Sequence, residues 1–213
     1  MKSNRLLMST VVAVVTGWTG WAIGQQLDAM PQQRARRIGE ILMEAAAKIR
    51  PAQVRIEADA AQATGLTINR DGIVVVPQKG LAESEGKPEW DFRAESGVGL
   101  GYLFMTDAFC PLVEGKPVAT KRMRALKVQD RQGRQVEVRC FLLAVRQLSD
   151  DDWRLYVYGA DKKPLVDVPF EAAERPGLGP LALEVEKVVD NQGTLAVTVL
   201  GKYKAGFRVV YQR

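Results

Sequence analysis

The pattern of apolar and polar positions divides the chain into three parts. Residues 6–24 carry no charged side chain, residues 31–50 place apolar residues at helical spacing, and the remainder alternates apolar and polar residues in short stretches. We therefore expect an apolar leader over 1–24, an amphipathic helix over 31–50 and a β-rich domain over 52–213.

The helix expected over residues 31–50 has good intrinsic propensity, because it contains the run Ala45–Ala47. Pro31 is tolerated in the first turn of a helix, and Pro51 ends it. The apolar stripe that we expect to pack against the β domain consists of Ile38, Ile41, Leu42, Ala45 and Ile49. A membrane-proximal stalk or an oligomer seam is the alternative use of this stripe.

The remainder of the chain reads as a series of short strands. Val54, Ile56 and Ala58 alternate with charged residues, as on a half-buried strand. The apolar run 73–76 follows Asn69–Gly72, whose Asp-Gly pair is a strong hairpin signal. Similar strands and turns recur about every 8–12 residues up to the C-terminus, which is typical of antiparallel sandwiches and barrels. We expect an all-β fold, mainly an antiparallel sandwich, with a barrel as the second choice.

The leader has the three parts of a secretory signal peptide. The basic residues Lys2 and Arg5 precede the apolar run Leu6–Val15. Two small residues within Ala22–Gly24 then suit cleavage before Gln25. We therefore expect the β domain to be exported.

The same segment also fits a membrane anchor that is kept. The uncharged stretch Leu6–Gly24 is close to the shortest helix that spans a bilayer, and Trp18 and Trp21 suit the boundary between lipid and water. Its small residues share one helix face and form a candidate surface for helix packing: Ala13, Gly17, Gly20 and Gly24. Cut or kept, the leader places residues 38–213 in the periplasm or outside the cell.

The net charge of +5 is concentrated near the N-terminus. Lys2 and Arg5 belong to the leader, and Arg34, Arg36 and Arg37 follow shortly after it. Beyond residue 37, 25 Lys and Arg stand against 24 Asp and Glu, so the β domain is nearly neutral. Nucleic-acid binding requires a concentrated basic face, and we therefore expect no nucleic-acid partner.

The chain contains no histidine. This excludes Ser-His-Asp and Cys-His catalysis and every metal site that relies on imidazole ligands. We accordingly predict no catalytic residues, no metal ligands and no cofactor. Carboxylate chemistry stays open, because acids in the segment 83–95 lie next to Trp90 and Phe92, a combination that sugar-acting sites use.

Cys110 and Cys140 are the two cysteines of the chain. In an oxidising compartment two cysteines usually pair, and we expect a disulfide that stabilises the fold by about 3 kcal/mol. Cys140 lies two residues from Val138 and from Leu142, so it shares their strand face and should point inward. Two buried free thiols are the alternative.

Aromatic residues are frequent on the strand near residue 155. Tyr156 and Tyr158 have the opposite parity to Leu155 and Val157, so they lie on the other strand face. Together with Trp153, they form a candidate contact face for a protein or a carbohydrate.

These features favour an exported, non-enzymatic binding or structural module at the cell envelope. The first alternative is a histidine-independent enzyme that uses carboxylates and acts on carbohydrates. The second is a membrane-anchored assembly subunit that oligomerises through its N-terminal helix. Residues 6–24 would then contact the membrane.

Overall fold

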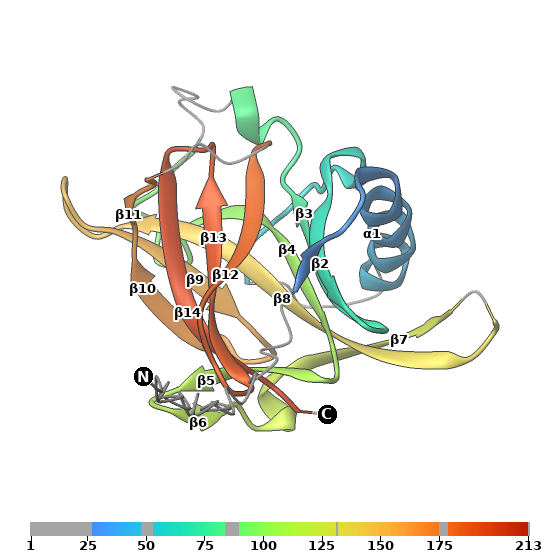
Figure 1. Cartoon of the computed structure of the whole chain (residues 1–213). Coiled ribbons are helices and arrows are strands. Elements are labelled where there is room, and N and C mark those ends of the chain that lie inside the picture. Colours follow the sequence, from blue (N-terminus) through green and yellow to red (C-terminus); the bar gives the residue numbers. More distant parts are fainter. Residues whose placement is uncertain (1–26, 48–52, 84–89, 131, 175–178, 213) are drawn as a thin grey trace, which may run out of the picture.

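The short apolar stretches form two antiparallel β-sheets (Figure 1). The computed structural model describes residues 27–47, 53–83, 90–130, 132–174 and 179–212. The expected leader, including the candidate packing face of Ala13, Gly17, Gly20 and Gly24, lies outside the described residues. Within them, no helix is long and apolar enough to cross a bilayer.

The larger sheet has eight strands and carries the candidate site. In spatial order its strands are β1 (Asp28–Ala29), β2 (Thr64–Ile68), β3 (Asp71–Pro77), β4 (Val98–Thr106), β8 (Gln135–Gln147), β9 (Trp153–Tyr158) and β10 (Val166–Pro169). The eighth strand, β7 (Arg124–Gln129), pairs with the first part of β8.

The smaller sheet has six strands. Its order is β12 (Leu181–Val189), β13 (Gln192–Val199), β14 (Tyr203–Tyr211), β5 (Phe109–Val113) and β6 (Lys116–Pro117), with β11 (Glu171–Ala172) also paired to β14. The described residues also contain three short 3₁₀ turns: η1 (Ala60–Gln62), between α1 and β2, and η2 (Leu81–Glu83) and η3 (Thr120–Arg122), each between two strands. The mainly antiparallel β prediction is confirmed, but neither described sheet closes into a barrel, so the second choice of fold is wrong.

One hydrophobic core joins the two sheets. Ile73 and Val75 of β3, Leu103 of β4 and Phe141 of β8 belong to it together with residues of β13 and β14. Strand side chains alternate between faces, so these residues mark the inner face of the larger sheet. Burial of these large side chains supplies the main driving force for folding.

The outer face of the larger sheet is also apolar, and two segments cover part of it. Helix α1 (Gln32–Ala46) packs over β3, β4, β7 and β8, where Val76 and Phe104 are buried (Figure 1). Val54, at the start of the extended segment after the helix, packs on Tyr156 and Tyr158. Burial on both faces explains why β3 reads as an uninterrupted apolar run rather than as an alternating one.

The predicted β2–β3 hairpin is confirmed. Its two strands pair with Ile68 opposite Asp71, so the turn residues are Asn69 and Arg70. Asn69 has a positive φ of 54°, which asparagine adopts more readily than most residues. The turn therefore precedes the Asp-Gly pair, and Asp71 enters the strand as a buried residue.

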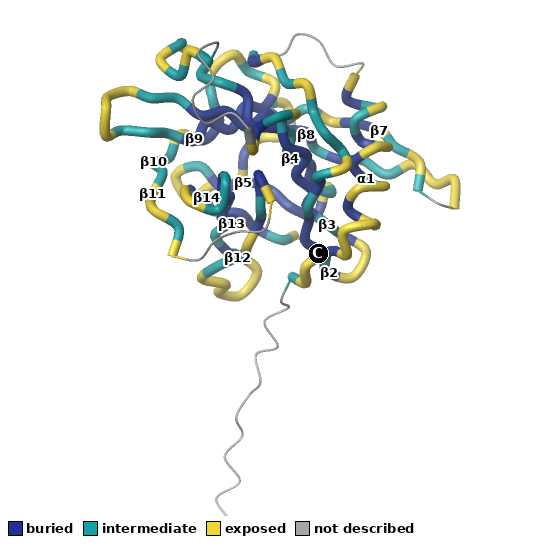
Figure 2. Tube along the Cα trace, turned by 90° about the horizontal axis from the view of Figure 1, so that it is seen from above, coloured by how far each residue is buried: buried dark blue, intermediate teal, exposed yellow. Residues whose placement is uncertain are grey.

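The β7–β8 hairpin extends past the end of β4. Pairing between β4 and β8 stops at Thr106 and Val138, whereas β7 continues beside β8 to Gln129 and Gln135. The hairpin reaches away from the body of the molecule, and its tip is exposed (Figures 1 and 2). This extension creates the far side of the groove described below.

Candidate ligand-binding groove

A groove lies on the outer face of the larger sheet, beside α1. Its volume is about 740 Å³, within the range of roughly 300–1,000 Å³ that is usual for small-molecule sites. Helix α1 forms one wall, and the tip of the β2–β3 hairpin and the β7–β8 hairpin border the other sides. We call it the arginine groove, after the lining residues Arg34, Arg37 and Arg70.

The inner part of the arginine groove is apolar. Val74, Phe104 and Val138 form its floor, on three adjacent strands of the larger sheet. Phe104 is only 1% exposed, so the floor is a rigid part of the core. Val128 and Val136, which face each other across the β7–β8 ladder, are half-buried and line the far side. This lining suits the apolar portion of a ligand.

The wall formed by α1 depends on how the helix is rotated against the sheet. Its buried residues are Ala35, Gly39, Leu42 and Ala46, most of them small. A Cβ atom added at Gly39 would lie 3.0 Å from the Cβ of Ala63, so the glycine lets the helix approach the segment before β2 closely. The helix therefore turns its smallest side chains toward the sheet.

The expected packing stripe on α1 is only partly correct. Leu42 is buried, but Ile38 is half-buried and Ile41 is 44% exposed, and both line the arginine groove. Ala45 is half-buried, and Ile49 lies outside the described residues. The physical reason is the close approach at Gly39, which leaves the bulkier isoleucines beside the contact.

The rim of the arginine groove is basic. Arg34 and Arg37 on α1 and Arg70 at the hairpin tip are exposed, and none of them forms an ion pair within the described residues. Arg36, on another face of the same helix, differs because its Nε donates to Oε1 of Glu40 at 3.0 Å. The three rim guanidinium groups are therefore available to a ligand, whereas that of Arg36 is engaged.

The two carboxylates that line the groove already have partners. Asp130 accepts hydrogen bonds from the Arg134 side chain at 2.7 Å, and this contact lowers the pKa of the Asp130 carboxyl. Oδ2 of the buried Asp71 accepts a hydrogen bond from the hydroxyl of Tyr211 at 3.0 Å. Arg134 compensates the charge of Asp130, whereas Asp71 sets one negative charge against the three rim arginines, so the groove keeps a net positive charge.

A second, smaller pocket lies between the larger and smaller sheets. Its volume is about 190 Å³, below the usual range for ligand sites. Leu27, Ile68, Val188 and Tyr211 are among the lining residues. We therefore regard the arginine groove as the candidate site.

The predicted disulfide between Cys110 and Cys140 is wrong. Both thiols are free and buried. Cys110 belongs to the core between the sheets, whereas Cys140 faces the cluster beneath α1 on the outer face of the larger sheet. Cys140 does point inward, but into a different core from that of Cys110, so the bond cannot form.

The buried thiol of Cys140 is unsuited to nucleophilic chemistry. Burial raises its pKa to about 12, and nearby Arg124 offsets only part of that shift. The reactive form of a cysteine is the thiolate, which this environment disfavours. Among the described residues there is also no group of three or more cysteines and acids arranged to hold a metal ion.

The expected aromatic contact face is not formed by the two tyrosines. Tyr156 is 5% and Tyr158 is 2% exposed, because Val54 and its neighbours cover that part of the sheet. The hydroxyl of Tyr158 donates to the carbonyl of Ser96 at 3.1 Å, and burial raises its pKa to about 12. These tyrosines serve packing in this structure.

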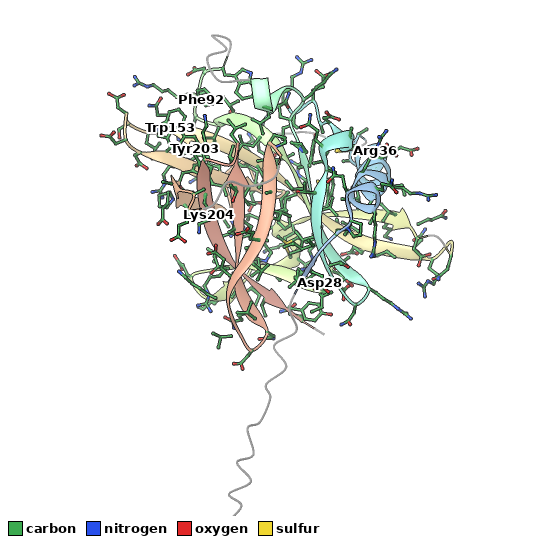
Figure 3. The ribbon with its side chains drawn as sticks, turned by 45° about the horizontal axis from the view of Figure 1, so that its top comes forward. Asp28, Arg36, Phe92, Trp153, Tyr203 and Lys204 are labelled. Carbon is green, nitrogen blue, oxygen red and sulfur yellow. The ribbon has the colours of Figure 1, made fainter. Side chains whose placement is uncertain are left out.

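Trp153 instead joins an aromatic cluster with residues of another segment. Its ring centroid lies 5.3 Å from that of Phe92, and Phe92 lies 5.9 Å from Trp90, both in edge-on geometry. All three rings are half-buried. Phe92 and Trp153 lie on the side of the molecule opposite α1, which carries the labelled Arg36 (Figure 3). The cluster is therefore separate from the arginine groove.

Comparisons with protein-family models, with curated proteins and with solved structures give no match to this chain. Its function is therefore inferred from its own sequence and geometry.

Several groove residues carry no recognisable signal in the sequence. The cluster Arg34–Arg37 is visible as a concentration of charge, but Glu40 lies four residues after Arg36 and three after Arg37, so spacing alone does not decide which arginine it pairs with. Arg70 reads as an ordinary turn residue until the hairpin is placed beside α1. Val128 and Val136 line the groove only because the β7–β8 hairpin extends beyond the end of β4.

Proposed function

We propose that this chain is an exported, non-enzymatic binding module of the cell envelope, and that it holds its ligand in the arginine groove. The domain is a two-sheet sandwich that follows the leader. The observation that carries the proposal is the groove itself, with a volume of about 740 Å³, an apolar floor and a rim of arginines that form no ion pair with another described residue. Concave sites that combine apolar walls with a few polar groups are the usual form of ligand sites.

The leader supports export. Its basic start, its apolar run and its small residues before Gln25 form a signal-peptide pattern. If the leader is kept, residues 6–24 tether the domain to the membrane, with α1 only a few residues further along the chain. The packing face of Ala13, Gly17, Gly20 and Gly24 would in that case also support assembly between copies.

The non-enzymatic assignment rests on the chemistry that the groove offers. The chain has no histidine, and the Cys140 thiol is held in its neutral form. The acids of the groove, Asp71 and Asp130, are occupied by Tyr211 and Arg134. With neither a histidine nor a reactive thiol to serve as base or nucleophile, binding is the better-supported role of the groove.

A carbohydrate-active role is the second candidate, and the aromatic cluster favours it. Trp90, Phe92 and Trp153 lie together, and acids of the same segment are nearby in the sequence. However, the carboxylate of Asp91 accepts a hydrogen bond from the backbone of Arg93 at 3.0 Å, which fits a turn. We therefore rank a sugar-contact surface ahead of a glycosidase in this region.

The proposal is tested by locating the protein and examining what it carries. The full chain is expressed with its own leader in a Gram-negative host, fractionated, and analysed by N-terminal sequencing and native mass spectrometry. We expect an extracytoplasmic or membrane-bound domain, starting at Gln25 or at Met1 respectively, with a small molecule bound at one copy per chain.

Two variants assign the bound molecule to the groove. Ile41→Glu places a carboxylate at an exposed groove position and should release the molecule. Arg36→Gln changes the same helix outside the groove and should retain it. A cytoplasmic protein with no bound molecule would contradict both halves of the proposal.

A further inference from the structure

We propose that the ligand of the arginine groove is a single-chain anionic lipid, an alkyl chain that ends in a carboxylate or phosphate. This inference rests on the proposed binding function and names the chemistry of its ligand. It follows from three features of the groove: the charge of the rim, the lack of free backbone groups in the floor, and the volume.

The charge of the rim selects an anion. Arg34, Arg37 and Arg70 approach the groove from two different elements, α1 and the β2–β3 hairpin, and lack ion-pair partners among the described residues. The guanidinium group is a planar donor that matches carboxylate and phosphate oxygens in bidentate geometry. Of the two lining acids, Asp130 is balanced by Arg134, so one carboxylate, that of Asp71, faces three arginines and the groove keeps a net positive charge.

The floor of the groove selects an alkyl chain rather than an extended peptide. It is the face of a sheet, and the backbone groups of β3, β4 and β8 already pair within the ladder. An extended peptide laid on this face would leave its own amides without backbone partners, which is costly in an apolar setting. An alkyl chain needs no hydrogen bonds, and it can contact Phe104, Val74 and Val138 directly.

The volume of the groove, about 740 Å³, is that of a small-molecule site. A single lipid chain with its head group falls within the size class that this volume accommodates.

The exposed part of α1 fits the same ligand. Ile38 and Ile41 lie one turn from Arg34 and Arg37, on the same side of the helix. The chain of the lipid would run along the isoleucines toward Val136, with its head group beside the arginines. Ile41, which is 44% exposed, would become buried on binding.

The test is calorimetric titration of the full-length protein with myristate below its micelle concentration. We expect saturable binding at one molecule per chain. Myristyl trimethylammonium, with the same chain length and the opposite charge, should bind at least about tenfold more weakly. Decanoate should also bind at least about tenfold more weakly, because its shorter chain buries less apolar surface in the groove.

Variants of the groove identify the contacts. The double change Arg34→Gln and Arg37→Gln should weaken myristate binding about tenfold or more, because charge-assisted hydrogen bonds to the head group are lost. Ile41→Glu should weaken it at least about tenfold, and Ile41→Gln by less, since only the former adds a repelling charge. Arg36→Gln is the matched control and should leave the affinity unchanged. Hexadecyl phosphate, tested beside palmitate, shows which head group the rim prefers.

Different failures have different meanings. Equal affinity for myristate and its cationic counterpart, or no effect of the arginine double variant, would overturn the lipid assignment. So would binding to phosphatidylglycerol vesicles or to an acidic amphipathic peptide in the absence of myristate binding. If an exported protein carries another molecule that Ile41→Glu releases, the proposed binding function stands and only the ligand class is wrong.

Discussion

The two faces of the eight-stranded sheet are both apolar, but they are used differently. The inner face meets the smaller sheet in one continuous core that contains Leu103 and Phe141. The outer face is covered in pieces by α1 and by the segment that begins near Val54, and the arginine groove lies beside α1. The face that the smaller sheet covers is filled by the core and stabilises the fold. The face that α1 covers only in part leaves room for a ligand.

The two cysteines illustrate the same division. Cys110 belongs to the inner core and Cys140 to the outer cluster beneath α1. Because the larger sheet separates them, each thiol packs as a small apolar side chain in its own environment. Substitutions on either side of the sheet should therefore affect stability and ligand binding differently.

The largest effect is expected on the inner face. Leu103 is fully buried, and Leu103→Ala should lower the free energy of unfolding by about 3 kcal/mol, because it leaves a cavity in the continuous core. Ile41→Ala on the outer side should cost less than about 1 kcal/mol, since that side chain is partly exposed. Denaturant unfolding measures both. An equal loss from the two changes would contradict the division between the faces.

The contact of α1 with the outer face should be the next most sensitive feature. Gly39→Leu should lower the free energy of unfolding by about 2 kcal/mol, because its side chain would collide with Ala63 and Val76 and lift the helix. Glu44→Leu, at an exposed position of the same helix, serves as the control in the same denaturant titration. A tolerated leucine at position 39 would mean that α1 is not closely seated.

The outer face should also be sensitive to alkaline pH. Burial raises the pKa of the Cys140 thiol to about 12 in the folded state, above its ordinary value of 9.0. The stabilisation is therefore complete below pH 9 and is lost as pH rises from 9 toward 12, because only the unfolded chain then releases the proton. We expect a loss of about 2–3 kcal/mol by pH 11.

Cys140→Ala isolates this contribution from other groups that titrate. Each protein is compared with its own stability at pH 7, so that the cavity left by the substitution cancels. The variant should lose less stability than the unmodified protein between pH 9 and 11. Identical slopes for the two would show that Cys140 is not buried as a neutral thiol. Equal unfolding curves with and without reductant would agree with two free thiols.

The smallest effect is expected on the solvent side of α1. Arg36 and Glu40 are both more than half exposed, and Arg36→Gln should cost about 0.3–0.5 kcal/mol. A double-mutant cycle with Glu40→Gln, followed by thermal unfolding at low salt, measures the pair. Arg34→Gln and Arg37→Gln should change stability even less, because they break no ion pair among the described residues. A loss above about 1 kcal/mol from either would assign them a structural role.

The local elements of the fold were largely predictable from the sequence. The hairpin at Asn69–Gly72, the helix that starts at Pro31 and the antiparallel strands follow from turn residues and periodicity. The rotation of α1 was not predictable in this way, because periodicity selected the bulky Ile38 and Ile41 as the packing stripe. The structure instead buries the smaller Ala35 and Gly39, and this choice depends on the neighbouring Ala63.

The arrangement between distant strands was beyond the sequence pattern. The alternation of residues along its strand placed Cys140 on an apolar face of the larger sheet. Both faces of this sheet are apolar, however, and only the strand order shows that Cys110 belongs to the core on the opposite face. Parity likewise placed Tyr156 and Tyr158 together, without revealing that Val54 covers them. The arginine groove has the same origin, since it needs α1, two hairpins and their relative position.

Isoleucine methyl NMR during a titration with myristate tests whether the arginine groove binds a single-chain anionic lipid. We expect saturable shifts at Ile38 and Ile41, which line the groove, and unchanged signals from the core residue Ile73. Ile68 lines the smaller pocket and should also stay unchanged. Shifts centred on Ile68, or no saturable shift at Ile38 and Ile41, would contradict lipid binding in the groove.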